Sequence, residues 1–402
     1  MTLPLQGLKV IELGRAYAAP WACQMLGDFG ADVIKVEDPR GGDFMRRTGP
    51  GFIKDAEGNP TSDSGKFSST NRNKRSVTAN IATPEGQEIV RRLLADADVF
   101  VENYKVGDLA RRGLDYESVK TLNPEIIHLS ITGFGQTGPK RFVGTLDPMI
   151  QAYSGFMSVN GEEGGPPLKS NMNIMDLNTG MFGAFAVMVA LHHRRNGGGG
   201  QHIDLSMYDC GASMMSFLML ASMAAGYQFP RMGSRNVDWV PSGTFPTADK
   251  PIYLAVGTDD DFRRFTTAVE RPEWLEDEAF LDRVSRNGQI DRIHALTEEA
   301  LSHDTAVNWV ERLNAVGILA APIYDFADLL ADPHTQARGL MVEAEHAAGA
   351  RIPLVRNPIL MSGIGATANV APPTLGQHTS DVLAGLGFSR DDLDAMRAKG
   401  AI

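Results

Sequence analysis

One aspartate, Asp176, stands where a carboxylate can act as a nucleophile. It directly precedes a long apolar run, in the sequence Asn-Ile-Met-Asp-Leu-Asn-Thr-Gly at 173–180. If that run is a helix, Asp176 lies near its amino end, where free amides and the helix dipole keep a carboxylate ionised. Position alone leaves two interpretations open. Asp176 either caps the helix by accepting amide hydrogen bonds from around Asn178 and Thr179, or it is a nucleophile partly shielded from water.

The turn after the first expected strand shows whether the chain could bind a dinucleotide. A strand expected at 8–13 ends at Gly14, and Glu37 and Asp38 close the next strand, as in a unit that binds NAD. A pyrophosphate site needs several glycines in that turn, because the backbone must approach the phosphates. Here the turn reads Gly-Arg-Ala-Tyr-Ala-Ala-Pro at 14–20 and keeps only the first glycine. The sequence therefore disfavours NAD.

Other familiar sites do not match the residue spacing. No two histidines are four positions apart and there is no Cys-x-x-Cys pair, so no metal site is predicted. No Gly-x-Ser-x-Gly stands at a strand-to-helix turn, which disfavours an α/β-hydrolase. The four glycines at 197–200 follow a helix and precede a strand, the reverse order of a phosphate-binding loop. They are expected to end the helix and form a turn.

Composition limits the class of protein that carries these residues. The chain has 402 residues, enough for two or three domains, and its 43% hydrophobic and 22% charged residues are typical of a globular protein. Its 49 acidic residues outnumber 38 basic ones, which argues against nucleic-acid binding, although a local basic cluster can still hold an anion. Two cysteines, no signal peptide and no apolar run of spanning length predict a cytoplasmic protein without a membrane partner.

Strand and helix patterns alternate through the first 130 residues, which predicts a parallel sheet with right-handed crossovers. Strands are expected at 8–13, 32–36, 76–81, 98–101 and 126–131, with helices at 20–29 and from 84 onward. Thr83 is expected to cap the second helix, with Pro84 at its first position, and Gly30 to end the first helix.

The rest of the chain is less regular and points to a second domain. The pattern predicts loops at 144–167, a helix at 177–195, a strand at 202–207, irregular chain at 227–250, a strand at 252–256, short helices at 262–316, a helical unit at 322–332, short strands at 340–362 and one late helix within 375–402. We expect a large domain at 1–226, a small domain at 227–330, and a segment at 331–402 that returns to the large domain.

Several short motifs occur in the order found in a known family. They are Leu5–Leu13, Leu26–Glu37, Asn73–Ser76, Thr83–Gly86, Val101–Tyr104, Arg111 with Gly113, Gly133–Pro139, Asp332–His334 and Leu375–Thr379. On these motifs the whole chain resembles the class III CoA-transferases (the CaiB/BaiF family), which include formyl-CoA transferase, carnitine CoA-transferase and α-methylacyl-CoA racemase. The resemblance implies an α/β fold: a large domain with a Rossmann-like parallel sheet, a smaller α+β domain, and a homodimer of interlocked, ring-like chains.

The resemblance also implies a reaction in which Asp176 is the catalytic aspartate. Its carboxylate attacks an acyl-CoA thioester, which gives a mixed anhydride and free CoA thiolate. The thiolate then attacks the aspartyl carbonyl, leaving CoA on Asp176 and releasing the first acid. An acceptor acid reverses these steps. Coenzyme A is the carrier substrate, and no tightly bound cofactor or metal is implied.

CoA carries phosphates, so an acidic protein needs local cations to bind it. The residues that the resemblance implies for CoA binding are Ala16, Tyr17, Arg40, Arg72, Lys74, Arg75 and Arg111. Ala16 and Tyr17 match a turn near the thioester, and Arg111 is the closest match among the cations. For each cation, a solvated surface charge is the alternative.

Position 146 separates transfer from racemisation. The racemase branch uses a second base, a histidine in a Gly-His-Asp segment, where this chain has Thr145–Leu146–Asp147. Leucine cannot move a proton, so racemisation is disfavoured. Asp147 remains a candidate catalytic-site residue that orients the active-site loop or substrate, or it is a simple turn residue.

Two further expectations concern activity and substrate. The retained nucleophile argues against an inactive CoA-binding protein. Residues 231–245 resemble the shorter loop of transferases other than formyl-CoA transferase, so oxalate and formate are not favoured substrates. A small dicarboxylate, a carnitine-like acid and an aromatic acid remain open.

Overall fold

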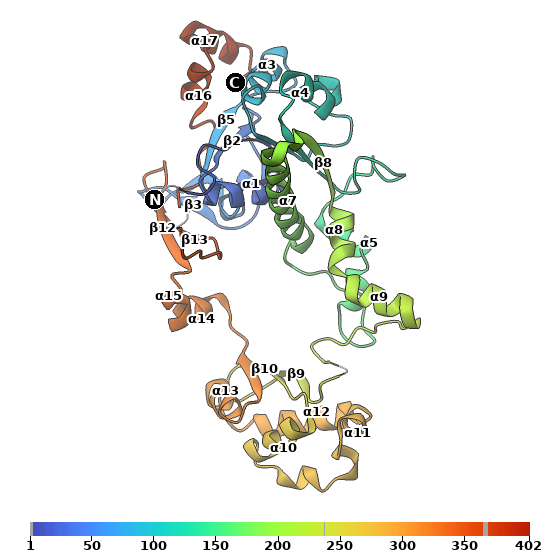
Figure 1. Cartoon of the computed structure of the whole chain (residues 1–402). Helices are drawn as coiled ribbons and strands as arrows, with labels where there is room; N and C mark the ends of the chain where they lie inside the picture. The colour runs from blue at the N-terminus through green and yellow to red at the C-terminus, as the bar shows by residue number, and fades with distance from the viewer. Residues whose placement is uncertain (1–2, 237, 365–368) are drawn as a thin grey trace. The chain divides into compact units, whose positions relative to one another are not determined.

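The computed structural model describes residues 3–236, 238–364 and 369–402. The chain divides into two compact units (Figure 1). The first comprises Met1–Phe156, Lys169–Tyr227 and Ala337–Ile402, and the second comprises Met157–Leu168 and Gln228–Gln336. Each unit has its own hydrophobic core.

A six-stranded parallel sheet forms the centre of the first unit, with strand order β5-β2-β1-β6-β7-β8. The strands are β1 (Lys9–Leu13), β2 (Asp32–Glu37), β5 (Lys74–Thr78), β6 (Val99–Glu102), β7 (Ile127–Thr132) and β8 (Gln201–Ser206). From β1 the chain builds outward through β2 to β5, and then returns to add β6, β7 and β8 on the other side. The strand order therefore reverses between β1 and β6, and the predicted parallel sheet is confirmed.

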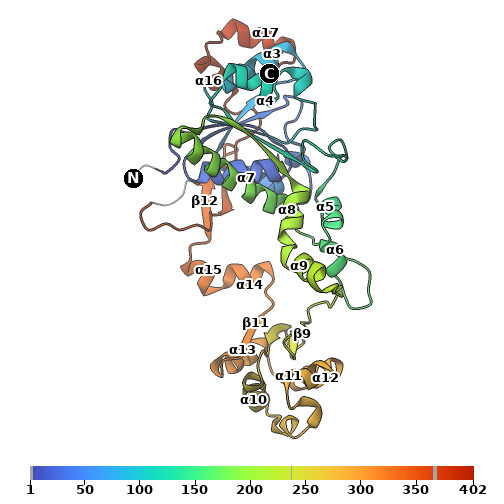
Figure 2. The same cartoon turned by 45° about the vertical axis from the view of Figure 1, so that its right-hand side comes forward.

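Helices cover both faces of this sheet (Figures 1 and 2). Apolar residues of α1 and α7 pack on one face, and those of α3, α4, α16 and α17 pack on the other. The helices of the first unit are α1 (Ala18–Asp28), α2 (Gly65–Ser68), α3 (Pro84–Leu94), α4 (Tyr116–Leu122), α5 (Asp147–Tyr153), α7 (Ile174–His193), α8 (Met207–Met214), α9 (Ser216–Ala225), α16 (Thr379–Gly385) and α17 (Arg390–Ala398). The short α6 (Phe156–Val159) follows α5 in the chain.

Local signals account for where these helices begin and end. Thr83 Oγ1 accepts from Gly86 N at 3.1 Å and Pro84 begins α3, as the sequence predicts. Gly30 has φ +99°, which lets the chain leave α1 directly into β2. Gly180 allows α7 to approach α1 closely, because a Cβ there would lie 2.7 Å from the Ala18 carbonyl oxygen.

Helix α7 has two different faces. The segment Ile174–Gly198, with mean hydropathy 1.6, is the one helix among the described residues that is long and apolar enough to cross a membrane. One side is buried against α1 and the sheet through residues such as Thr179, Gly183 and Val187. The other side exposes apolar side chains, including Phe185 and Val189.

The second unit is a small α+β domain. Its three antiparallel strands, in order β11-β10-β9, are β9 (Ser242–Phe245), β10 (Ile252–Ala255) and β11 (Leu319–Pro322). Its helices are α10 (Asp259–Ala268), α11 (Arg283–Asn287), α12 (Ile290–Leu301), α13 (Ala306–Ala315) and α14 (Phe326–Ala331). Helix α15 (Pro333–Ala337) begins in this unit, and its last residue is the first of the segment Ala337–Ile402 of the first unit. Phe262, Phe265, Trp274 and Trp309 dominate the core between helices and strands.

Several elements differ from the sequence-based expectation. A two-stranded hairpin, β3 (Phe52–Lys54) and β4 (Pro60–Ser64), is present where no strand was predicted. A second hairpin, β12 (Met341–Glu345) and β13 (Arg351–Val355), agrees in contrast with the short strands predicted at 340–362. The C-terminal tail holds two helices, not the one predicted. Gly387, with φ +85°, separates α16 from α17.

Candidate active site

The candidate site begins where the strand order of the sheet reverses. In open α/β sheets, ligands bind outside the carboxyl ends of the strands at this point. The turn after β1 and the segment after β6 are tied together here: Arg15 N donates to Asn103 Oδ1 at 3.0 Å, and Asn103 Nδ2 donates to the Arg15 carbonyl at 2.8 Å. A small polar cleft at this edge is lined by Arg15, Asp38, Tyr104 and their neighbours.

Asp176 lies in the first turn of α7, but it does not cap the helix. Asp147, at the start of α5, supplies the cap instead: its Oδ2 accepts from Met175 N at 2.8 Å and from Asp176 N at 3.0 Å. The other Asp147 oxygen accepts from Gln151 Nε2 at 2.5 Å. The capping interpretation of Asp176 is therefore wrong, and its carboxylate is left free of the helix amides.

The pKa of Asp176 is raised to about 7. Burial is the main cause and the negative charge of Asp147 adds to it, while a long hydrogen bond from Asn173 Nδ2, at 3.5 Å, opposes both. This differs from the expectation that the helix terminus would keep the carboxylate ionised. The reason is that Asp147 occupies the amides that would have stabilised the charge of Asp176.

The turn at 14–20 brings two further predicted residues to Asp176. Tyr17 immediately precedes α1, which packs against α7. Burial raises the pKa of the Tyr17 hydroxyl, and the negative charges of Asp176 and Asp43 raise it further. Ala16 has φ +62°, a left-handed conformation that is uncommon for a residue with a Cβ. Tyr17 thus presents a neutral phenol in the surroundings of the Asp176 carboxylate.

Two of the predicted cations lie at the carboxyl edge of the sheet and are exposed. Arg40 follows β2 and forms a bidentate pair with Asp38, at 2.7 and 3.0 Å. Arg111 follows β6 and pairs with Asp108. Both guanidinium groups remain accessible to a ligand, because their side chains are 75% and 69% exposed.

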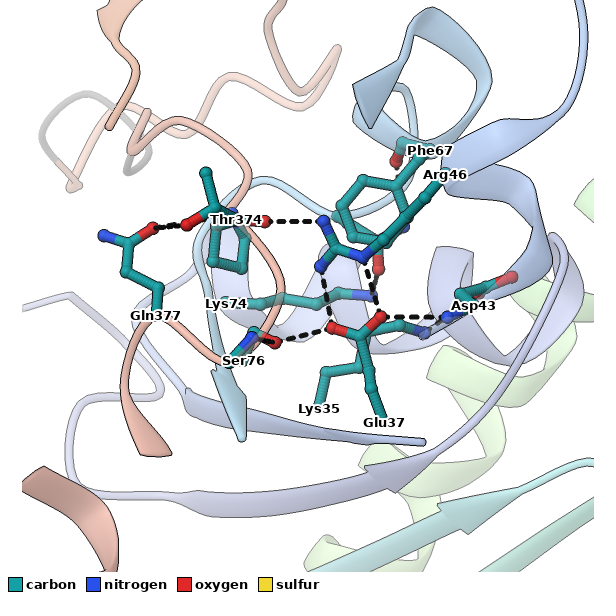
Figure 3. Close-up of polar contacts among 12 residues, drawn as sticks. Lys35, Glu37, Asp43, Arg46, Phe67, Lys74, Ser76, Thr374 and Gln377 are labelled. Atoms are coloured by element: carbon teal, nitrogen blue, oxygen red, sulfur yellow. Dashed lines mark hydrogen bonds and ion pairs between the residues drawn. The ribbon is translucent and has the colours of Figure 1, made fainter. Parts of the chain in front are cut away.

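The other three predicted cations are engaged elsewhere. Arg72 is buried and binds Asp28 at 2.5 Å, and Arg75 binds Asp32 at 2.5 Å, both at the amino ends of β2 and β5. Lys74 is buried within a network of charged residues (Figure 3).

Sequence reasoning missed Arg15. Its Nη2 donates to the Tyr104 hydroxyl at 2.8 Å, and its guanidinium carbon lies 4.8 Å from the centroid of the Tyr104 ring. The available signal was its position, since a basic residue directly after the first strand of a parallel sheet faces the ligand-binding edge. Leu146, in contrast, is 63% exposed before α5 and offers no base beside Asp147.

A larger cavity of about 830 Å³ lies next to Tyr17, in the turn at 14–20. Tyr17, Trp21 and Leu177 line one part of it, and the remaining wall comes from β3, β13, the residues that flank them and the segment 65–72. Leu177 directly follows Asp176 in the chain, and the cavity that Leu177 lines is large enough for an acyl group. The wall is mostly apolar, with Lys54 and Arg351 among its few charged residues.

The sequence of the chain is similar to that of proteins named as CoA-transferases. The family model described as CoA-transferase family III matches residues 5–379. The succinate–glutarate CoA-transferase of Agrobacterium fabrum is 41% identical, over 95% of this chain and 96% of its own length. The human succinyl-CoA:glutarate CoA-transferase is 32% identical, over 94% of this chain and 85% of its own length.

A solved structure shows the same architecture. The crystal structure of a CAIB/BAIF family protein from Brucella suis is 39% identical and aligns with a TM-score of 0.89. The alignment covers 96% of this chain and 100% of that chain.

Proposed function

The chain belongs to CoA-transferase family III and is a CoA-transferase, and from this premise we propose that Asp176 carries CoA as a thioester during transfer. The observation that supports this role most directly is that Asp147, and not Asp176, accepts the hydrogen bonds of the first-turn amides of α7. Asp147 holds the first turn of α7, and the Asp176 carboxylate is left partly buried, free of helix amides and close to Tyr17. A carboxylate in such surroundings is more basic than usual, which favours nucleophilic attack once it is ionised.

The proposed reaction proceeds in balanced steps. An Asp176 oxygen attacks the thioester carbonyl, the carbon–sulfur bond breaks, and CoA leaves as a thiolate while a mixed anhydride forms. The thiolate attacks the aspartyl carbonyl and displaces the donor acid as a carboxylate. The acceptor carboxylate then attacks the aspartyl thioester, and the released thiolate attacks the acyl carbonyl of the new anhydride. This restores Asp176 and forms the new acyl-CoA.

We propose that CoA enters at the carboxyl edge of the sheet, between the ends of β1 and β6. Arg15, Arg40 and Arg111 are the candidate phosphate contacts, because all three follow strands at this edge. Arg72 and Arg75 lie at the opposite edge and Lys74 is buried against Glu12, so we assign them no direct phosphate contact. Ala16 and Tyr17 would lie beside the thioester, at the end of the CoA arm.

A dicarboxylic acid is the proposed substrate class. The similar proteins from Agrobacterium fabrum and human are named for succinate or succinyl-CoA and glutarate. The cavity beside Asp176 has apolar walls for a short methylene chain and a few cations for a second carboxylate. This narrows the three acid classes that the sequence leaves open.

We propose that the enzyme is a homodimer. Helices α7 and α9 expose large apolar side chains, among them Phe185 at 67%, Phe217 at 70% and Met223 at 76%. Apolar surface of this extent marks an interaction site. A second copy of the chain is the partner that the family resemblance favours.

Trapping the intermediate tests the proposed mechanism. Succinyl-CoA is added without an acceptor acid, and the protein is digested and analysed by mass spectrometry. We expect a CoA adduct on the peptide that contains Asp176, and its disappearance with formation of glutaryl-CoA when glutarate is added. Asp176→Ala should abolish both the adduct and turnover. Asp209→Ala removes another first-turn aspartate, on α8, and should leave both intact.

Two results would contradict the proposal. One is full turnover by Asp176→Ala. The other is exchange of the α-proton of a 2-methylacyl-CoA for deuterium without any acceptor acid, which would indicate the racemase reaction that Leu146 disfavours.

A further inference from the structure

Two buried lysines lie beneath the turn that carries Tyr17. Lys35 projects from β2 and Lys74 from β5, and both side chains are fully buried. They share one carboxylate, that of Glu12 on β1: Lys35 Nζ lies 2.8 Å from Glu12 Oε1, and Lys74 Nζ lies 2.7 Å from Glu12 Oε2. Neither lysine takes part in the steps of the proposed reaction.

Each lysine also binds the backbone of the segment between β1 and α1. Lys35 Nζ donates to the Gly14 carbonyl at 2.7 Å, and Lys74 Nζ donates to the Pro20 carbonyl at 2.8 Å. These carbonyls stand at the two ends of segment 14–20, which contains Tyr17. The segment is therefore held at both ends by ammonium groups that a single carboxylate, Glu12, brings together.

A third contact holds the middle of the segment. Asp43 Oδ2 lies 3.2 Å from Lys35 Nζ, and Asp43 Oδ1 accepts from Ala16 N at 3.4 Å. Figure 3 shows Lys35 and Lys74 beside the cluster in which Glu37 contacts Arg46, Ser76 and the Asp43 amide. Ala16 keeps its left-handed conformation only because its surroundings impose it. The Lys35–Asp43 pair is part of those surroundings, and Tyr17 is the next residue.

We propose that Lys35 and Lys74 are positioning residues for CoA transfer. By fixing segment 14–20 they keep Tyr17 beside Asp176 and limit the access of water to its carboxylate. Buried ion pairs often contribute no more stability than apolar residues of similar size. A role in holding the backbone of segment 14–20 therefore accounts better than stability does for the four buried charges, which are Glu12, Lys35, Asp43 and Lys74. The inference rests on the proposed function of Asp176.

Kinetics of Lys35→Met and Lys74→Met test this inference. Both substitutions keep the length of the side chain and remove its charge. We expect kcat to fall by about 10-fold to 100-fold, because a small displacement at the reacting group is costly. The KM for acyl-CoA should change by less than about threefold, since the proposed phosphate contacts are untouched.

The pH profile separates positioning from a general loss of stability. The charge of Asp147 raises the pKa of Asp176, and the charge of Asp176 in turn raises the pKa of Tyr17; neither Asp147 nor Tyr17 is changed in these variants. If segment 14–20 relaxes, water reaches Asp176 and its raised pKa falls. The acid limb of kcat should therefore move to lower pH in both lysine variants.

Arg286→Met, in the small domain, is the matched control. Arg286 is equally buried and binds Asp259 at 2.7 Å, the Phe280 carbonyl at 3.1 Å and the Val240 carbonyl at 3.2 Å, and none of these partners contacts segment 14–20 or Asp43. It should lose stability without the fall in kcat or the displaced acid limb. If Arg286→Met and the lysine variants lose kcat equally, or if the acid limb of the lysine variants stays in place, the inference is overturned.

A milder substitution keeps the test decisive if the lysine variants do not fold. Asp43→Asn preserves size and an oxygen that can accept from Ala16 N, but removes the charge that faces Lys35. It should show a smaller fall in kcat and the same direction of pH shift, and an unchanged profile would overturn the inference. Failure of the proposed function looks different, because Asp176→Ala would then retain turnover.

Discussion

At the scale of single residues, the site depends on how two aspartates divide the amides of one helix. Asp147 takes the first-turn amides of α7, and Asp176 is left with burial and a like charge nearby. Both effects raise the pKa of Asp176, to about 7. The nucleophile must be ionised, so formation of the CoA adduct should be slow below this pH and approach its maximum above it.

Asp147→Asn tests the contribution of the like charge. The amide oxygen of asparagine can still accept from the first turn, but the negative charge is gone. The pKa of Asp176 should then fall, and the acid limb of adduct formation should move down by about half to one pH unit. Stopped-flow measurement of the first half-reaction across about pH 5–9, a range that extends to both sides of the raised pKa of Asp176, gives this limb directly.

The control for this measurement is Asp209→Asn, which changes a first-turn aspartate of α8. It should leave the acid limb in place. If Asp147→Asn also leaves it in place, the charge of Asp147 does not act on the nucleophile, and desolvation alone sets its pKa.

At the scale of elements, the contact between α1 and α7 sets the distance between Tyr17 and Asp176. Gly180 permits that contact, because an added Cβ would lie 2.7 Å from the Ala18 carbonyl oxygen and 2.9 Å from a ring carbon of Trp21. Gly180→Ala should therefore force the helices apart. We expect a loss of about 1–3 kcal/mol of unfolding free energy in urea, together with a lower kcat.

Gly385→Ala is the matched control at this scale. Gly385 ends α16, and a Cβ there meets no atom within 4 Å. It should leave both stability and kcat close to the original values. Equal behaviour of the two alanine variants would show that α1 and α7 do not limit the geometry of the site.

The elements of the parallel sheet were predictable because their signals are local. Short runs such as β6, which begins with three apolar residues, are bounded by turns. An N-cap threonine followed by proline, as at Thr83–Pro84, predicts the start of α3. The hairpin β3–β4 was not predictable in this way, since β4 reads Pro-Thr-Ser-Asp-Ser and carries no apolar alternation. Only one of the two tail helices was predicted, because both are short and only residues 386–389 lie between them.

The site was predictable only as far as motifs and chain order reach. Asp176 was singled out by its position before the apolar run, and the resemblance then supplied its catalytic role and pointed to the turn at Ala16–Tyr17. The cap from Asp147 was not, because it joins residues 28 and 29 positions apart. Lys74 was interpreted as a phosphate contact because a basic residue in a motif looks the same whether it is exposed or buried. Only the tertiary fold brings Glu12 and the Pro20 carbonyl to it.

At the scale of the whole molecule, the proposed homodimer would cover the exposed apolar faces of α7 and α9. An interlocked dimer makes a sharper prediction than an ordinary one. Two chains that pass through each other cannot separate while both are folded, so exchange of subunits is limited by the rate of unfolding. Tagged and untagged dimers, mixed and followed by native mass spectrometry, should not form hybrids within days, and dilution should not release folded monomers.

Substitutions on the apolar faces connect this assembly to stability. Phe185→Ser and Phe217→Ser should lower the denaturation midpoint of the proposed dimer, because each removes an apolar side chain that the second chain would cover. Val284→Ser, on α11 of the small domain, removes a side chain that is 77% exposed and should change the midpoint little. Folded monomers at nanomolar concentration would exclude the interlocked arrangement. If they also retained full turnover, each chain would hold a complete site, and the apolar faces would serve some other partner.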